Sequence, residues 1–160
     1  MSPKTLAFAL AISLGMSTAC RRAPEPDTAE APASPPNVLL ITIDTLRADR
    51  LGCYGYERAH TPHTDRFAAE GVRVERAIAP TPLTLPSHTS ILTGLEPPAH
   101  SVRGNGVFRV PDSLQTLAES LKAEGYQTQA FVSSDVLHHR FNLDQGFDGY
   151  EDDLSGEAKD

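Results

Sequence analysis

The stretch Leu83–Gly94, which reads LTLPSHTSILTG, holds the local signals from which the middle of the chain can be interpreted. Pro86 has a φ angle fixed near the helical value and lacks an N–H, so it suits the first turn of a helix. Gly94 can adopt the left-handed conformation that ends a helix. We therefore expect the Thr84 hydroxyl to lie just ahead of a helix, facing free N–H donors and the positive end of the helix dipole. Such a place favours an anion, but it is equally the place of an ordinary N-cap.

Apolar runs and helix signals alternate on both sides of this stretch. We predict strands at 37–43, 72–79 and 126–133, helices at 61–71, 86–94 and 114–125, and a loop at 141–150. The first run is nearly continuous in β-branched and apolar residues, which is typical of a strand covered on both faces. Strands that alternate with helices predict an α/β fold with a mostly parallel sheet and flanking helices.

The front of the chain has a different character from the rest. Residues 1–20 combine a lysine, a short apolar run and small residues before Cys20, which indicates an export signal too short to span a membrane. Small residues leading into a cysteine resemble a bacterial lipoprotein processing site, so Cys20 is a candidate lipid attachment point; plain secretion is the alternative. Residues 21–36 are rich in Pro, Ala and Glu and predict a disordered tether. The globular part is then 37–160.

Charge and cysteine content narrow the classes of function. The chain has 160 residues and a formal net charge of −7, and Arg47, Arg50 and Lys122 form no basic stripe, so we expect no nucleic-acid partner. If Cys20 carries lipid, Cys53 is left alone and no internal disulfide forms. Cys53 lacks a cationic neighbourhood, which favours a packing role over a reactive one. Since the acidic tail offers no closing element, we expect a truncated domain with a marginal core.

Four blocks in order resemble the N-terminal half of the sulfatase family, a branch of the alkaline phosphatase superfamily of metal-dependent ester hydrolases. They are Pro36–Asp44, Leu51–Gly55, Thr61–Asp65 and Pro86–Gly94, and the resemblance runs from about 36 to 150. It implies a partial alkaline-phosphatase-like α/β sandwich whose C-terminal half, with the remaining metal ligands, is missing here.

The resemblance also implies roles for individual residues. Asp44 matches the aspartate at a strand end that binds the metal, and Thr84 occupies the position of the nucleophile, which also touches the metal. His88 follows on the same helix and is a candidate catalytic residue. Asn105 resembles the asparagine that binds a substrate oxygen in nucleotide pyrophosphatase/phosphodiesterases. The implied cofactor is a divalent ion (Ca, Mg, Zn or Mn), and the implied partners are a small-molecule or glycan ester and, through Cys20, a membrane.

Departures from the sulfatase pattern bear on the chemistry. Sulfatases carry Cys or Ser, oxidised to formylglycine, where this chain has Thr84, and an arginine where it has His88. Thr45 replaces a second aspartate, and residues 133–137 lack the expected Lys and His. Thr-x-Pro-x-His is instead the pattern of phosphodiesterase and phosphonate-hydrolase branches, in which threonine attacks directly.

These observations predict an exported, membrane-tethered or secreted hydrolase of sulfate, phosphate or phosphonate esters, with Thr84 as the nucleophile. We expect the 160-residue chain alone to be inactive, because Asp44 and Thr84 supply too few metal ligands. The alternative is a truncated, non-catalytic surface lipoprotein that serves as a binding module or is a gene fragment.

Overall fold

The computed structural model describes residues 35–155 of the 160-residue chain. The predicted export signal at 1–20, the candidate lipid site Cys20 and most of the predicted tether at 21–36 lie outside the described residues. The chain divides into two units, 1–41 and 42–160. Within the described residues, no helix combines the length and the apolar character that a membrane span requires.

Two of the three predicted strands do not form. Residues 37–43 and 72–79 carry no strand assignment, and their side chains are exposed, including Leu39 (83%), Val72 (94%) and Ile78 (82%). A strand is stable only when its backbone N–H and C=O groups pair with a neighbouring strand and one face is buried. The prediction of strands at 37–43 and 72–79, which rested on their apolar residues, is therefore wrong.

The first two helices follow their sequence signals closely. Helix α1 (Pro62–Glu70) begins after Thr61 with a proline in its first turn and ends at Gly71. Helix α2 (Thr84–Thr93) ends at Gly94, whose φ of 69° is left-handed, as predicted. The start of α2 was predicted wrongly: Thr84 is its first residue and Leu83 is the N-cap, so Thr84 neither precedes the helix nor caps it.

The later helices depart from prediction. A short helix, α3 (Pro97–His100), was not predicted. Helix α4 (Leu117–Ala123) begins three residues later than the apolar spacing from Leu114 suggested. The reason is a capping box: the Thr116 hydroxyl accepts the Glu119 N–H at 3.1 Å, and the Glu119 carboxylate accepts the Thr116 N–H at 2.8 Å.

The described residues contain one two-stranded parallel sheet. Strand β1 (Gln129–Phe131) pairs with β2 (Gly149–Glu151) in the register Ala130 to Tyr150. Strand β1 lies in the middle of the predicted third strand, 126–133. Strand β2 was not predicted, and it begins at the C-terminal end of the loop predicted at 141–150. The 3₁₀ helices are η1 (Ala48–Arg50), η2 (Gly52–Tyr54), η3 (Asp135–Leu137) and η4 (His139–Phe141).

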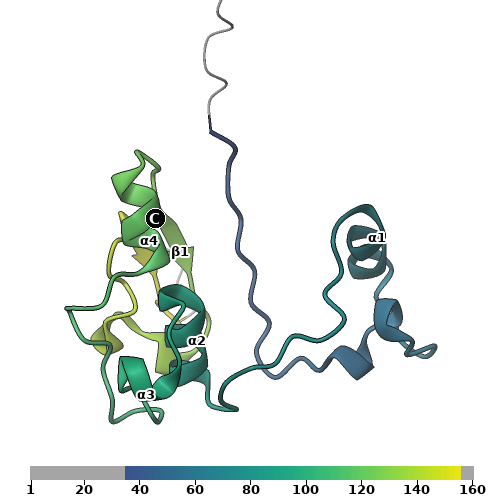
Figure 1. The fold of residues 1–160 in the computed structure, drawn as a ribbon, viewed down its shortest axis with the longest axis horizontal. Coiled ribbons are helices and arrows are strands. Elements are labelled where there is room, and N and C mark those ends of the chain that lie inside the picture. Colours follow the sequence, from purple (N-terminus) through teal and green to yellow (C-terminus); the bar gives the residue numbers. More distant parts are fainter. Residues whose placement is uncertain (1–34, 156–160) are drawn as a thin grey trace, which may run out of the picture. The chain divides into compact units, whose positions relative to one another are not determined.

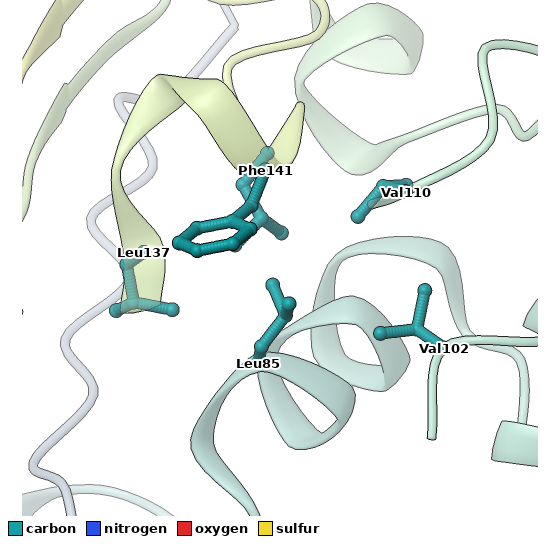
Figure 2. Close-up of a cluster of buried hydrophobic side chains, with 6 residues drawn as sticks. Leu85, Val102, Val110, Leu137 and Phe141 are labelled. Atoms are coloured by element: carbon teal, nitrogen blue, oxygen red, sulfur yellow. The ribbon is translucent and has the colours of Figure 1, made fainter. Parts of the chain in front are cut away.

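One apolar cluster joins α2 to the later segments. Its buried members are Leu85, Val102, Val110, Leu137, Phe141 and Leu143. Figure 2 shows Leu85 of α2 and Phe141 of η4 pointing into the same interior space, with Leu137 on one side and Val102 and Val110 on the other. Helices α2 and α3 pack side by side in the teal part of the ribbon in Figure 1. The first turn of α2 is therefore anchored in the core.

Candidate active site

The position of Thr84 follows from the packing of its neighbour. Leu85 is completely buried, while Thr84 is half-buried at the start of α2. Because successive residues of a helix point about 100° apart, the burial of Leu85 fixes the direction in which the Thr84 side chain leaves the helix. A hydroxyl in the first turn of a ten-residue helix also lies near the positive end of the helix dipole.

Asp44 lies against Thr84 although 40 residues separate them. The Thr84 Oγ1 hydroxyl donates a hydrogen bond of 3.1 Å to Asp44 Oδ2, and Asp44 Oδ1 accepts the backbone N–H of Thr45 at 3.0 Å. Thr45 has a φ of 55°, which is unusual for a β-branched residue and costs on the order of 1–3 kcal/mol. This turn holds the exposed Asp44 carboxylate beside the hydroxyl, and no local sequence signal predicts the strained conformation of Thr45.

Asn105 reaches the same helix start from the loop between Val102 and Val110. Its Oδ1 accepts the backbone N–H of Leu85 at 2.9 Å, so a residue 20 positions away caps α2. Since this bond takes the Leu85 N–H and Pro86 has none, the expected group of free N–H donors is smaller than predicted. The NH2 group of Asn105 takes no part in the cap and is the remaining donor that the side chain can offer to a ligand.

His88 lies one turn after Thr84, and its ring contacts the backbone of its own helix and a side chain of the segment that carries Asp44. Its Nδ1 is 2.9 Å from the Thr84 carbonyl oxygen, and its Nε2 is 3.1 Å from the Thr42 hydroxyl. A carbonyl only accepts, so in the neutral ring Nδ1 carries the proton and Nε2 accepts from Thr42. His88 therefore joins α2 to the segment that carries Asp44, and neither ring nitrogen bonds the Thr84 hydroxyl.

His100, at the end of α3, holds the loop that carries Asn105. Its Nδ1 accepts the Val102 N–H at 3.1 Å, and its Nε2 lies 3.0 Å from the Ser90 hydroxyl of α2. The ring is fully buried, and this burial lowers its pKa below the ordinary value. His100 therefore braces this loop against α2.

The four predicted site residues thus come from three segments, since Thr84 and His88 share α2, and they meet at one helix start. Asp44 contacts Thr84 directly, Asn105 contacts the next residue of the helix, and His88 contacts the carbonyl of Thr84. Sequence reasoning did not find Thr42, which holds His88, or Leu85, whose burial orients Thr84. Neither carries a local signal, because a threonine in an apolar run and a leucine in a helix are both ordinary.

The fold and these contacts define an α/β protein with parallel strands and flanking helices of the alkaline-phosphatase-like type. It is similar to a solved 2-O GAG sulfatase, with a TM-score of 0.58 and 25% identity over 73% of this chain and 25% of that chain. The Sulfatase family model matches residues 36–158. The chain belongs to the sulfatase family.

Individual relatives agree with this assignment. The chain is 36% identical to the steryl-sulfatase of Mus musculus over 148 residues, which cover 80% of this chain and 23% of the relative. It is 31% identical to the N-acetylgalactosamine-6-O-sulfatase of Bacteroides thetaiotaomicron, over 72% of this chain and 23% of the relative. It is 41% identical to arylsulfatase A of Bos taurus, over 61% and 20%. The chain spans about a quarter of the length of the relatives it matches.

Members of the sulfatase family use a divalent metal, typically calcium. Asp44 Oδ2 and Thr84 Oγ1 are hard oxygen donors, the kind that calcium and magnesium prefer, and they lie 3.1 Å apart. Calcium takes six to eight oxygen ligands, so these two donors form only one side of such a site. The two oxygens are of the kind that such a metal binds, but two ligands are too few to complete its coordination.

Proposed function

We propose that this chain carries the nucleophile region of a metal-dependent hydrolase of sulfate, phosphate or phosphonate esters, with Thr84 as the attacking residue. The observation that supports the proposal most strongly is the 3.1 Å hydrogen bond between Thr84 Oγ1 and Asp44 Oδ2. It places a hydroxyl, a carboxylate and a helix start together, which is the set of groups needed to activate an alcohol beside an anionic ester.

In the proposed reaction, the Thr84 hydroxyl loses its proton, a bond forms between Thr84 Oγ1 and the sulfur or phosphorus of the ester, and the bond to the leaving oxygen breaks. The leaving oxygen takes up a proton from solvent and departs as the alcohol. Asp44 orients the hydroxyl through their hydrogen bond, and the NH2 of Asn105 donates to an oxygen of the transferred group. A bound divalent metal would supply Lewis-acid chemistry that lowers the pKa of the hydroxyl. Water then releases the group from Thr84.

Two arguments bear on which class of ester is the substrate, and they point in opposite directions. The relatives are named as sulfatases, which favours a sulfate ester. Threonine at position 84 favours direct attack, as in the phosphodiesterase-type branches, and residues 133–137 lack the Lys and His expected at a sulfate site. We propose that a sulfate ester is the slowest substrate of the three classes.

We also propose that the protein is exported and held at a membrane through lipid on Cys20. The support is the apolar run and the small residues that precede this cysteine. A wild-type protein that partitions with membranes, and a Cys20→Ser variant that does not mature, would agree with the proposal. Recovery of the wild type in the soluble periplasm with a free N-terminus would contradict it.

Substitution of Thr84 tests the nucleophile in the full-length protein that carries this chain. Thr84→Ala should reduce the hydrolysis rate by on the order of a thousandfold or more, as loss of a direct nucleophile does. Thr84→Ser should retain much of the activity, since the hydroxyl remains. The wild type and the two variants are compared by their initial rates of hydrolysis. The substrates are an aryl phosphate, a phosphodiester, a phosphonate and a sulfate, each with added Ca²⁺, Mg²⁺, Zn²⁺ or Mn²⁺.

Two results would contradict this proposal. Equal rates for Thr84→Ala and the wild type would show that Thr84 is not the attacking residue. A sulfate substrate hydrolysed faster than the phosphorus esters would overturn the proposed order. Thr93→Ala is the matched control, because Thr93 lies at the other end of α2 and its hydroxyl bonds the Thr89 carbonyl.

A further inference from the structure

A second group of ligand-type side chains lies where η4 meets the end of β2. A ring nitrogen from each of His138 and His139 and a carboxylate oxygen of Asp152 lie within 4.8 Å of one another. His139 Nδ1 is 2.7 Å from Asp152 Oδ2, and His138 Nδ1 is 3.8 Å from the same oxygen. None of these three residues is among the site residues predicted from the sequence.

We propose that His138, His139 and Asp152 bind a divalent transition-metal ion of the zinc type. Two imidazoles and one carboxylate are a common ligand set for zinc, with water in the fourth position. Zinc holds such ligands at about 2.0–2.1 Å, so the ligand atoms of a tetrahedral site lie about 3.3 Å from one another. The two histidine–carboxylate distances of 2.7 and 3.8 Å fall on either side of that value. All three ligand atoms lie within 4.8 Å of one another, so shifts of up to about 1.5 Å would bring them to it.

The surrounding contacts hold the three side chains in place without a metal. The backbone N–H of His139 donates to Asp152 Oδ2 at 2.6 Å, and the Tyr150 hydroxyl of β2 donates to the Leu137 carbonyl at 2.6 Å. Leu137 and Phe141, which flank the two histidines, are buried in the apolar cluster. Little ordering of the backbone is therefore needed on binding, which favours affinity.

The charges around His138, His139 and Asp152 also allow a cation to bind there. The guanidinium of Arg140, the cation next in sequence, pairs with Asp135 rather than with Asp152. The side chain of Asp152 is only 13% exposed, so its negative charge is weakly screened by solvent. Binding through His138 Nδ1 would replace the 3.1 Å hydrogen bond by which this nitrogen accepts the Arg140 N–H.

This site differs in ligand chemistry from the region around Asp44 and Thr84. Imidazole nitrogens favour zinc and other transition metals, whereas a site built from oxygens alone suits calcium and magnesium. An ion bound to both η4 and the residue after β2 would join two segments that are separated in sequence. We therefore expect it to stabilise the folded chain.

Titration of the whole chain with Zn²⁺, followed by calorimetry, tests the proposal. We expect one zinc per chain, a melting temperature that rises with zinc concentration, and Co²⁺ absorption bands of the four-coordinate type. His139→Gln, which keeps a hydrogen-bond donor, and Asp152→Asn, which keeps an acceptor, should each weaken zinc binding at least tenfold. Far-UV circular dichroism checks that both variants fold.

Three controls separate this site from other sources of binding. The double variant His60→Ala/His63→Ala removes two exposed histidines elsewhere, and Asp44→Asn removes a ligand of the proposed catalytic metal; both should leave zinc binding unchanged. A hundredfold excess of Ca²⁺ should not displace the zinc. The proposal is wrong if His139→Gln binds zinc as tightly as the wild type, or if Asp44→Asn abolishes the binding.

Discussion

At the scale of single residues, Asn105 has two separable functions in one side chain. Its oxygen caps the Leu85 N–H, which stabilises the start of α2, and its NH2 group is the donor that we assign to the substrate. Alanine removes both groups, whereas aspartate keeps an oxygen acceptor and removes only the donor. The two substitutions can therefore distinguish a structural contribution from a chemical one.

We expect Asn105→Ala to lower the free energy of unfolding by about 1 kcal/mol, the typical cost of a lost helix cap. Asn105→Asp should unfold near the wild-type midpoint, because a carboxylate is favourable at a helix start. Both variants should lose about a hundredfold in hydrolysis rate, as removal of one oxyanion donor does. Urea denaturation and initial rates provide the measurements. Full activity of Asn105→Asp would exclude the donor role.

His100 should make stability depend on pH. Burial lowers its pKa in the folded state below the ordinary value of 6.5, so the unfolded chain binds more protons between these two values. The free energy of unfolding should therefore fall as the pH is lowered through about 6.5, until the folded-state pKa is reached. Urea midpoints from pH 8 to pH 5 measure this slope.

His100→Gln should flatten the pH dependence relative to the wild type, although it also removes a packed ring. The exposed His63→Gln, a control with the same chemical change, should leave the slope as it is. A wild-type slope retained in His100→Gln would mean that other groups cause the pH dependence.

At the scale of elements, helix α4 and the loop before β2 lie in direct contact. The Thr116 hydroxyl at the α4 cap donates to the Gln145 carbonyl at 2.9 Å. Gly146 follows with a φ of 86°, and a Cβ at this position would lie 2.3 Å from the backbone nitrogen of Glu119. Only glycine allows the loop to approach the first turn of the helix so closely.

Gly146→Ala should lower the free energy of unfolding by about 3 kcal/mol, because a backbone clash adds to the cost of a left-handed alanine. Gly106→Ala is the matched control: its φ is 78°, and no atom lies within 4 Å of the added Cβ. It should cost only about 1 kcal/mol. Equal losses in the two variants, measured by urea denaturation, would show that the close contact is absent in solution.

At the scale of the whole molecule, apolar residues divide into a buried group and an exposed group. Val102 is 1% exposed in the apolar cluster, whereas Val72 is 94% exposed in the segment predicted to be a strand. The two valines have the same side chain, so their substitution compares the two environments directly.

Val102→Ser should lower the free energy of unfolding by about 2–3 kcal/mol, since it removes buried apolar surface and buries a hydroxyl. Val72→Ser should change it by less than about 0.5 kcal/mol, as is usual for exposed positions. Chemical denaturation of the two variants measures the difference. A loss at Val72 as large as that at Val102 would show that residues 72–79 are packed against a partner.

Several features were determined by the sequence itself because their causes are local. Pro62 and Gly71 bound α1, and Gly94 ends α2, because proline and glycine restrict or extend the backbone at their own positions. The Thr116–Glu119 capping box is also a local signal, and it starts α4 three residues after Leu114, the first residue of the predicted helix. The motifs around Asp44 and Thr84 likewise carried the family resemblance that the family match confirmed.

Only the tertiary structure decided which of these local signals act together. It paired β2 with β1, where the sequence predicted loop, and left 37–43 and 72–79 without strand partners. It brought Asp44 to Thr84 and Asn105 to Leu85 across 40 and 20 residues. Strand pairing and long-range contacts depend on which surfaces the packed core brings together, and that information is not contained in any one stretch of residues.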